Sequence, residues 1–234
     1  MKLVLLLVIV LVSFTSPAQD DHVWKPASRE SAAYHEYRIK ITMPPYGLSK
    51  IKALIAKIEV DDEDTEALEP GVYNALSLRE KFTYHMIHAE SYSQDSDPMP
   101  PIQDEHKKIF AHLPVAFDEY NWSDRQSAFL KRNRDSVIAL MKESITRTKR
   151  VGLNFKHAII EINAKEMIPL LITAYNATKK DLDILTLLML LMKENEYEPF
   201  LVSASYKKLY SADSGYLSYL SYNNSNEDLV IKRA

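Results

Sequence analysis

Two histidines three positions apart are the first candidates for chemistry in this sequence. His85 and His88 fall in a segment with helical periodicity, so their side chains are expected on one face of a helix. Neutral imidazoles placed in this way can share a zinc ion. A zinc hydrolase needs a third ligand, and the candidates are His106 or His112, with Glu90 and Asp104 as further possibilities if the fold brings them near. Because zinc–nitrogen bonds are about 2 Å long, the ligands would have to lie within about 10 Å of one another.

The same two histidines also have a purely structural interpretation. The pair is not part of an HExxH signature, so the spacing alone suggests zinc. In the structural interpretation, His85 is a hydrogen-bonded residue at the edge of the core and His88 lies on the surface. The expectation for cofactors is therefore none, with zinc as the alternative.

Signatures of other catalytic classes are missing from the sequence. The chain has no cysteine, and no serine stands in a G-x-S-x-G turn, which removes the common motifs of nucleophilic catalysis. Four glycines are too few for a glycine-rich phosphate-binding loop. The formal net charge of −3, with basic residues scattered among acidic ones, argues against nucleic acid as a partner.

Tyrosines are the other candidates for a binding site. The chain has fourteen, and several crowd its carboxyl end. Aromatic rings offer a large contact area for sugars and peptides at a small cost in conformational entropy. The candidate ligand-binding residues are Tyr206, Tyr210, Tyr216 and Tyr219. Alternatively, Tyr206 and Tyr210 pack a terminal helix over the end of a helical stack.

The amino terminus resembles a secretory signal peptide spanning residues 1–18. Lys2 precedes the apolar run Leu3 to Val12, and Ser16-Pro17-Ala18 places small residues at the expected cleavage site. A retained amino-terminal anchor is the alternative interpretation of this segment. We expect export to the periplasm or the medium, with no membrane span after cleavage, and the absence of disulfides suits a bacterial protein.

Residues 163–194 contain the densest apolar patch after the signal segment. Ile168, Leu171, Ile172 and Tyr175 have the spacing of one buried helical stripe, and Pro169 predicts either a helix start near Ile168 or a kink. Every residue from Ile184 to Met192 except Thr186 is apolar, so this second helix must be covered on all sides. Nine residues rise only about 14 Å, which is too short to cross a bilayer.

This stretch, EMIPLLITAYNATKKDLDILTLLMLLMK, resembles a HEAT-type repeat unit over about residues 164–194. The likeness lies in the proline of the first helix, the polar turn carrying aspartate and the more buried second helix. The family usually has a Val-Arg pair near the start of its second helix, where this chain has Ile184 and Leu185. The resemblance implies antiparallel helical hairpins stacked as an α-solenoid or an irregular bundle.

The whole chain is predicted to be mostly α-helical, with residues 19–234 forming a single domain. Ser77 with Glu80, and Ser123 with Gln126, are expected to cap two helices. Helices are predicted at residues 48–59, 77–92, 102–112, 123–150, 155–162, 203–210 and in the central stretch. A short strand is expected at 37–43, a break at 93–101, a loose arm at 20–33 and a polar, disordered tail at 223–234.

Two functions follow from these patterns. The first is an exported, non-catalytic helical protein that binds a protein, peptide or glycan of the cell envelope, a hypothesis based on fold-level analogy. The alternative is an exported hydrolase, with or without a metal ion, centred on His85 and His88. A structural or storage role is a third class that the sequence leaves open.

Overall fold

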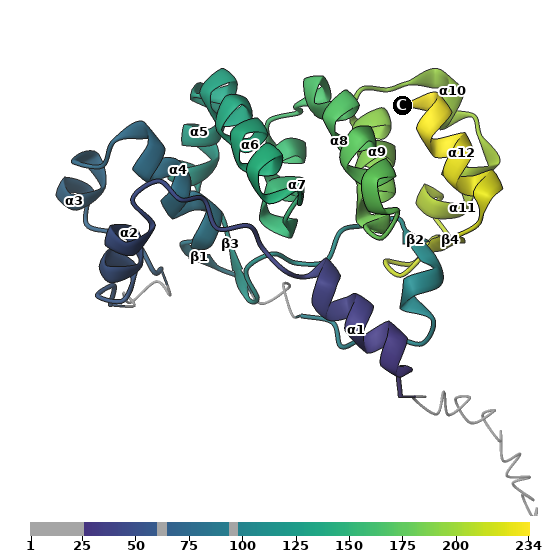
Figure 1. Ribbon diagram of the computed structural model, residues 1–234, viewed down its shortest axis with the longest axis horizontal. Helices are drawn as coiled ribbons and strands as arrows, with labels where there is room; N and C mark the ends of the chain where they lie inside the picture. The colour runs from purple at the N-terminus through teal and green to yellow at the C-terminus, as the bar shows by residue number, and fades with distance from the viewer. Residues whose placement is uncertain (1–25, 60–64, 94–97) are drawn as a thin grey trace, which may run out of the picture.

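The computed structural model describes residues 26–59, 65–93 and 98–234. It is mostly helical, with two short two-stranded sheets, as the sequence predicts. Figure 1 shows most of the helices side by side in a long row, with α2 and α3 at one end and α10 to α12 at the other. The first helix, α1, lies apart from this row, below it in that view.

The elements follow one another along the chain in this order. The first part of the chain contains α1 (Arg29–Arg38), α2 (Leu48–Ile55), α3 (Pro70–Asn74), α4 (Leu78–Ile87), β1 (Ser91–Tyr92), η1 (Glu105–Lys107), β2 (Lys108–Phe110) and β3 (Tyr120–Asn121). The second part contains α5 (Asp124–Arg132), α6 (Arg134–Thr148), α7 (Leu153–Glu161), η2 (Lys165–Met167), α8 (Ile168–Thr178), α9 (Leu182–Glu194), α10 (Glu198–Leu201), α11 (Ala204–Tyr210), β4 (Tyr219–Ser221) and α12 (Asn224–Arg233).

The predicted core helix is α9, and it has no solvent face along most of its length. From Leu182 to Met192 every residue except Leu190 is buried. It contacts α7, α8, α10, α12 and strand β2. The expectation that the apolar run Ile184–Met192 lies inside the body of the protein is confirmed.

The hairpin of α8 and α9 settles how Pro169 is accommodated. Helix α8 begins at Ile168, after the 3₁₀ turn η2, so the proline occupies the first turn, where its missing N–H costs nothing. Asp181 stands at the N-cap position of α9 but makes no capping hydrogen bond. Whether this hairpin is a true HEAT unit stays a prediction.

Both predicted capping boxes are present. Ser77 and Glu80 open α4, and Ser123 and Gln126 open α5.

The single long helix expected to follow Ser123 is wrong, because the chain leaves helical geometry at Asn133, where φ is −107° and ψ is 27°. The Asn133 side chain donates to the carbonyl of Phe129 at 2.9 Å, a local bond that competes with the helical ladder.

The strand expected at 37–43 does not form, and part of the expected loose arm at 20–33 is helical. Ser28 caps α1, which continues through Arg38. The extended residues that follow are bound by a side chain, because Asn154 accepts from the Thr42 N–H at 3.0 Å and donates to the Thr42 carbonyl at 2.8 Å. Gly152 permits this contact, since a Cβ there would lie 2.2 Å from the Thr42 nitrogen.

The helix expected at 102–112 is also wrong, and the 3₁₀ turn η1 and strand β2 occupy the middle of this segment. This strand pairs antiparallel with β4 in a register that sets Ile109 opposite Leu220. Both residues are buried. A partner more than one hundred residues away gives no local signal, whereas the isolated segment has an acceptable helical pattern.

The tail is ordered, in contrast to the predicted disorder. Asn223 caps α12, which buries Glu227 and Val230 and packs on α9. The expected break at 93–101 falls partly outside the described residues. Just before it, β1 pairs antiparallel with β3.

No helix in the described part of the chain is long and apolar enough to cross a membrane. The predicted signal segment, residues 1–18, lies outside the described residues.

Candidate functional site

A buried ion pair joins the end of α1 to the start of α9. Arg38 donates from Nε and Nη2 to the two carboxylate oxygens of Asp183, at 3.0 and 2.7 Å. Its Nη1 donates to Glu105 at 2.9 Å. All three side chains are almost completely buried. Two-point recognition of a carboxylate by arginine fixes both distance and orientation, so the pair determines how α1 lies against α9.

Glu105 is positioned by the tight turn at η1. Asp104, which precedes it, has a left-handed backbone with φ of 55°. The Glu105 carboxylate accepts from His35 Nδ1 at 2.9 Å and from the Ile102 N–H at 3.1 Å, in addition to Arg38. Its own N–H donates to the Ser31 hydroxyl at 3.2 Å. Helix α1 is thereby hydrogen-bonded to both the backbone N–H and the side chain of Glu105 in η1.

A lysine on α7 extends the network. Lys156, fully buried, donates to Asp181 at 2.6 Å and lies 3.8 Å from Asp183. Asp183 therefore lies between two cations from separate helices, α1 and α7. A buried carboxylate without such partners would be strongly destabilising.

The electrostatics keep the centre of this network ionised. Burial opposes the charge on Asp183, but the positive charges of Arg38 and Lys156 outweigh it and lower the pKa of Asp183. Burial likewise opposes the charge on Glu105, and the hydrogen bonds from His35 and Arg38 lower its pKa. Asp181 differs, because burial outweighs the attraction of Lys156 and raises its pKa.

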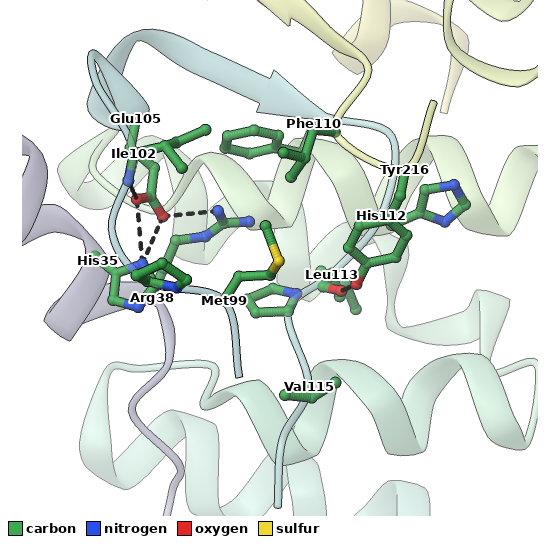
Figure 2. A pocket seen from close by; sticks show the side chains of 13 residues that line it. His35, Arg38, Met99, Ile102, Glu105, Phe110, His112, Leu113, Val115 and Tyr216 are labelled. Carbon is green, nitrogen blue, oxygen red and sulfur yellow. Dashed lines mark hydrogen bonds and ion pairs between the residues drawn. The ribbon is translucent and has the colours of Figure 1, made fainter. Parts of the chain in front are cut away.

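A small pocket opens beside Arg38, and Figure 2 shows it from close by. We call it the Arg38 pocket. It encloses about 40 Å³. Its polar wall consists of His35, Arg38 and Glu105. The remaining lining is mainly apolar and comes from the chain around β2 and before β4: Met99, Pro100, Ile102, Phe110, Leu113, Pro114, Val115 and Leu217, with His112 and Tyr216.

One edge of the Arg38 pocket is a pair of stacked rings. His112 and Tyr216 are nearly parallel, at 4°, with ring centroids 5.2 Å apart. The Tyr216 hydroxyl donates to the Leu113 carbonyl at 3.1 Å, which holds the ring in place although 53% of the residue is exposed. Burial and the nearby charge of Lys193 lower the pKa of His112, so it is neutral at pH 7.

Chemically, the polar wall is largely occupied by its own contacts. The Glu105 carboxylate accepts from three groups, and the Arg38 guanidinium donates three of its five N–H groups to carboxylates. The guanidinium also lies over the Phe110 ring, 4.4 Å from its centroid. This arrangement offers donors for an acceptor atom next to an apolar cavity.

His85 and His88 lie on α4 and at its end, outside the Arg38 pocket. Both are buried, so His88 is not the surface residue of the structural interpretation. His85 Nε2 bonds with the Tyr73 hydroxyl at 3.1 Å, and its ring packs on Phe129 with centroids 4.7 Å apart. His88 Nε2 bonds with the Glu66 carbonyl.

The structure does not gather the four histidines into one site. His106 bonds with Ser31 at 3.1 Å and His112 stacks on Tyr216, each in different surroundings from His85. Among the described residues, no three His, Asp or Glu side chains are grouped so that they could hold a metal ion. The zinc centre therefore stays a prediction without an identified third ligand.

The four candidate tyrosines have separate roles. Tyr206 and Tyr210 pack against each other and on Phe200, and the Tyr210 hydroxyl donates to the Ala111 carbonyl at 2.9 Å. The two rings therefore pack within the fold, but the terminal helix of the chain is α12 and not α11, which carries them. Tyr219 lies edge-on to Phe110 beside β2. Of the four, Tyr216 lines the Arg38 pocket.

Sequence reasoning missed Arg38, Glu105, Lys156 and Asp183 as site residues. A signal was present, because an aspartate at the start of a helix without a solvent face must be buried with a cation. The sequence does not say which of the many basic residues supplies it.

Breaking the buried pair is predicted to be far more costly than breaking an exposed one. Arg38→Met leaves Asp183 and Glu105 without their main cation, so we expect a loss of about 3–5 kcal/mol in the free energy of unfolding. The control is Arg79→Met, which removes an exposed pair with Glu143 at 3.4 Å and should cost about 0–1 kcal/mol. Urea unfolding at pH 7 measures both, and equal losses would contradict the role given to Arg38.

The buried His85 predicts a loss of stability in acid. Burial, with the positive charges of Arg125 and Lys81, lowers its pKa from 6.5 to about 3. Below pH 6.5 the unfolded chain therefore takes up a proton that the folded protein does not, and stability falls as pH falls toward 3. Between pH 7 and pH 5 this residue should account for about 2 kcal/mol.

Urea unfolding at pH 7 and at pH 5 measures how much of the change in the free energy of unfolding is due to His85. His85→Gln should lose less stability than the wild type over this interval, whatever its stability at pH 7. Identical losses in both proteins would show that His85 does not titrate differently on unfolding.

Comparison of the chain with protein-family models, with curated proteins and with solved structures finds no match. The functional argument therefore starts from the geometry of the site.

Proposed function

We propose that this protein binds an extended segment of a partner protein and holds one apolar side chain of that segment in the Arg38 pocket. The observation that carries the proposal is a small, mainly apolar pocket whose polar wall is fixed by buried ion pairs. Pockets of this composition, with a few convergent polar groups, are the usual form of binding sites. The partner belongs to the cell envelope if the predicted export takes place.

Size favours a peptide over a glycan. A single water molecule needs a free volume of about 10–15 Å³. The Arg38 pocket, with about 40 Å³, therefore has room for about three carbon or sulfur atoms. The end of a valine, leucine or methionine side chain fits this space. A sugar ring is too large to enter it.

The polar wall favours binding over hydrolysis. Glu105 and Asp183 are held by strong partners, so neither is free to act as a base without breaking them. The two N–H groups of Arg38 that those carboxylates do not use can bind an acceptor, such as a backbone carbonyl beside the apolar side chain. The alternative hydrolase centred on His85 and His88 gains no support from their burial.

The test starts from a phage-displayed library of random twelve-residue peptides selected on the purified protein. We expect the selected peptides to share one apolar position. Val115 lines the pocket and is only partly buried, so Val115→Trp should fill the space and weaken binding of a synthetic consensus peptide by about tenfold or more in calorimetry.

The matched control is Val202→Trp, because Val202 is 66% exposed and does not line the Arg38 pocket. It should bind the consensus peptide as the wild type does. Failure to select any common sequence, or full binding by Val115→Trp, would contradict the proposed function.

A further inference from the structure

A second, larger pocket adjoins the Arg38 pocket. It encloses about 420 Å³, and the two share His112, Leu113 and Tyr216. We call it the Glu161 pocket. Its other lining residues are Asn121, Trp122, Ser127, His157, Ile160, Glu161 and Leu190. Leu190 is the residue of α9 that escapes burial between Leu182 and Met192, and it does so at this pocket.

The stacked rings of His112 and Tyr216 form part of both pockets. The two ring centroids are 5.2 Å apart, and the two pockets meet at this pair of rings. In an extended chain, side chains two positions apart point the same way and are separated by about 6.5–7 Å. A segment that places one side chain in the Arg38 pocket can therefore place the side chain two positions away in the Glu161 pocket.

The charge of the Glu161 pocket selects the kind of side chain. Glu161 is its one acidic lining residue among those described. The lining histidines are neutral at pH 7, since burial lowers the pKa of His112 and of His157. His157 donates from Nε2 to the Pro114 carbonyl at 2.7 Å, which also fixes its ring. Glu161 is thus the one charged side chain in the described lining of this pocket.

The rest of the lining suits the stem of a long cationic side chain. Ile160, Leu190 and Trp122 are apolar or aromatic, and long lysine and arginine stems pack on such surfaces while the charged head reaches a polar group. Lys131 lies 2.9 Å from Glu161, but Lys131 is largely exposed and the pair is a weak one that an incoming cation can replace.

We infer that the bound segment carries an arginine or lysine two positions from its apolar anchor, with the cationic side chain in the Glu161 pocket. This inference rests on the proposed function, and it adds the partner's sequence pattern. The peptide is fixed at two points, and the His112–Tyr216 pair separates the two side chains.

The experiment uses two synthetic peptides derived from the selected consensus, one with arginine and one with glutamine two positions from the apolar anchor. Calorimetry on the wild type should show the arginine peptide binding about fivefold more tightly at low salt. Glu161→Gln should abolish this difference while leaving binding of the glutamine peptide unchanged. Glu143→Gln, which alters an exposed ion pair elsewhere on the chain, should keep the difference.

The outcomes separate the two proposals. If both peptides bind the wild type equally, or if Glu161→Gln keeps the preference for arginine, the inference is wrong while the Arg38 pocket can still bind its anchor. If Val115→Trp binds both peptides as the wild type does, the proposed function itself fails. Circular dichroism of each variant verifies that the fold is intact.

Discussion

The structure depends on the burial of helix α9, which has almost no solvent-exposed face between Leu182 and Met192. Helix α9 must be covered on every side, and the cover comes from α7, α8, α10, α12 and β2, which lie between residues 108 and 233. Packing these elements around α9 also buries its polar first residues. Asp181 and Asp183 would be too costly to bury alone, so Lys156 and Arg38 accompany them. The need to cover one apolar helix thus explains both the core and the ion network within it.

The Arg38 pocket is a consequence of how that cover is assembled. The pocket is lined by residues of α1, η1, β2 and three loop segments, 99–102, 112–115 and 216–217, rather than by a helical hairpin. Loops fit less closely than helices, and their residues are free to serve binding. The ion network makes one wall of the pocket rigid, because moving Arg38 would break both of its hydrogen bonds to the buried Asp183. A rigid wall suits recognition, since little entropy is lost when a ligand binds.

Local features of the fold could be predicted, whereas features that join distant segments could not. The capping boxes at Ser77 and Ser123, and the burial of α9, depend on neighbouring residues in the sequence. The pairing of Ile109 with Leu220 and of Arg38 with Asp183 joins residues more than one hundred positions apart. Tyr216 was identified as a candidate because aromatic residues suit binding, and His112 only as a zinc ligand, whereas the polar wall of the pocket was missed. Helix α12 was missed because its buried stripe is short and its sequence is otherwise polar.

Hydrogen exchange of the wild-type protein, read residue by residue by NMR at pH 7, tests the central claim most directly. If the Arg38–Asp183 and Glu105 contacts fasten α1 to the core, the amides of its later turns open only with the global transition. Their protection should then approach that of α9. Amides of α1 that exchange orders of magnitude faster than those of α9, through local opening, would contradict this account.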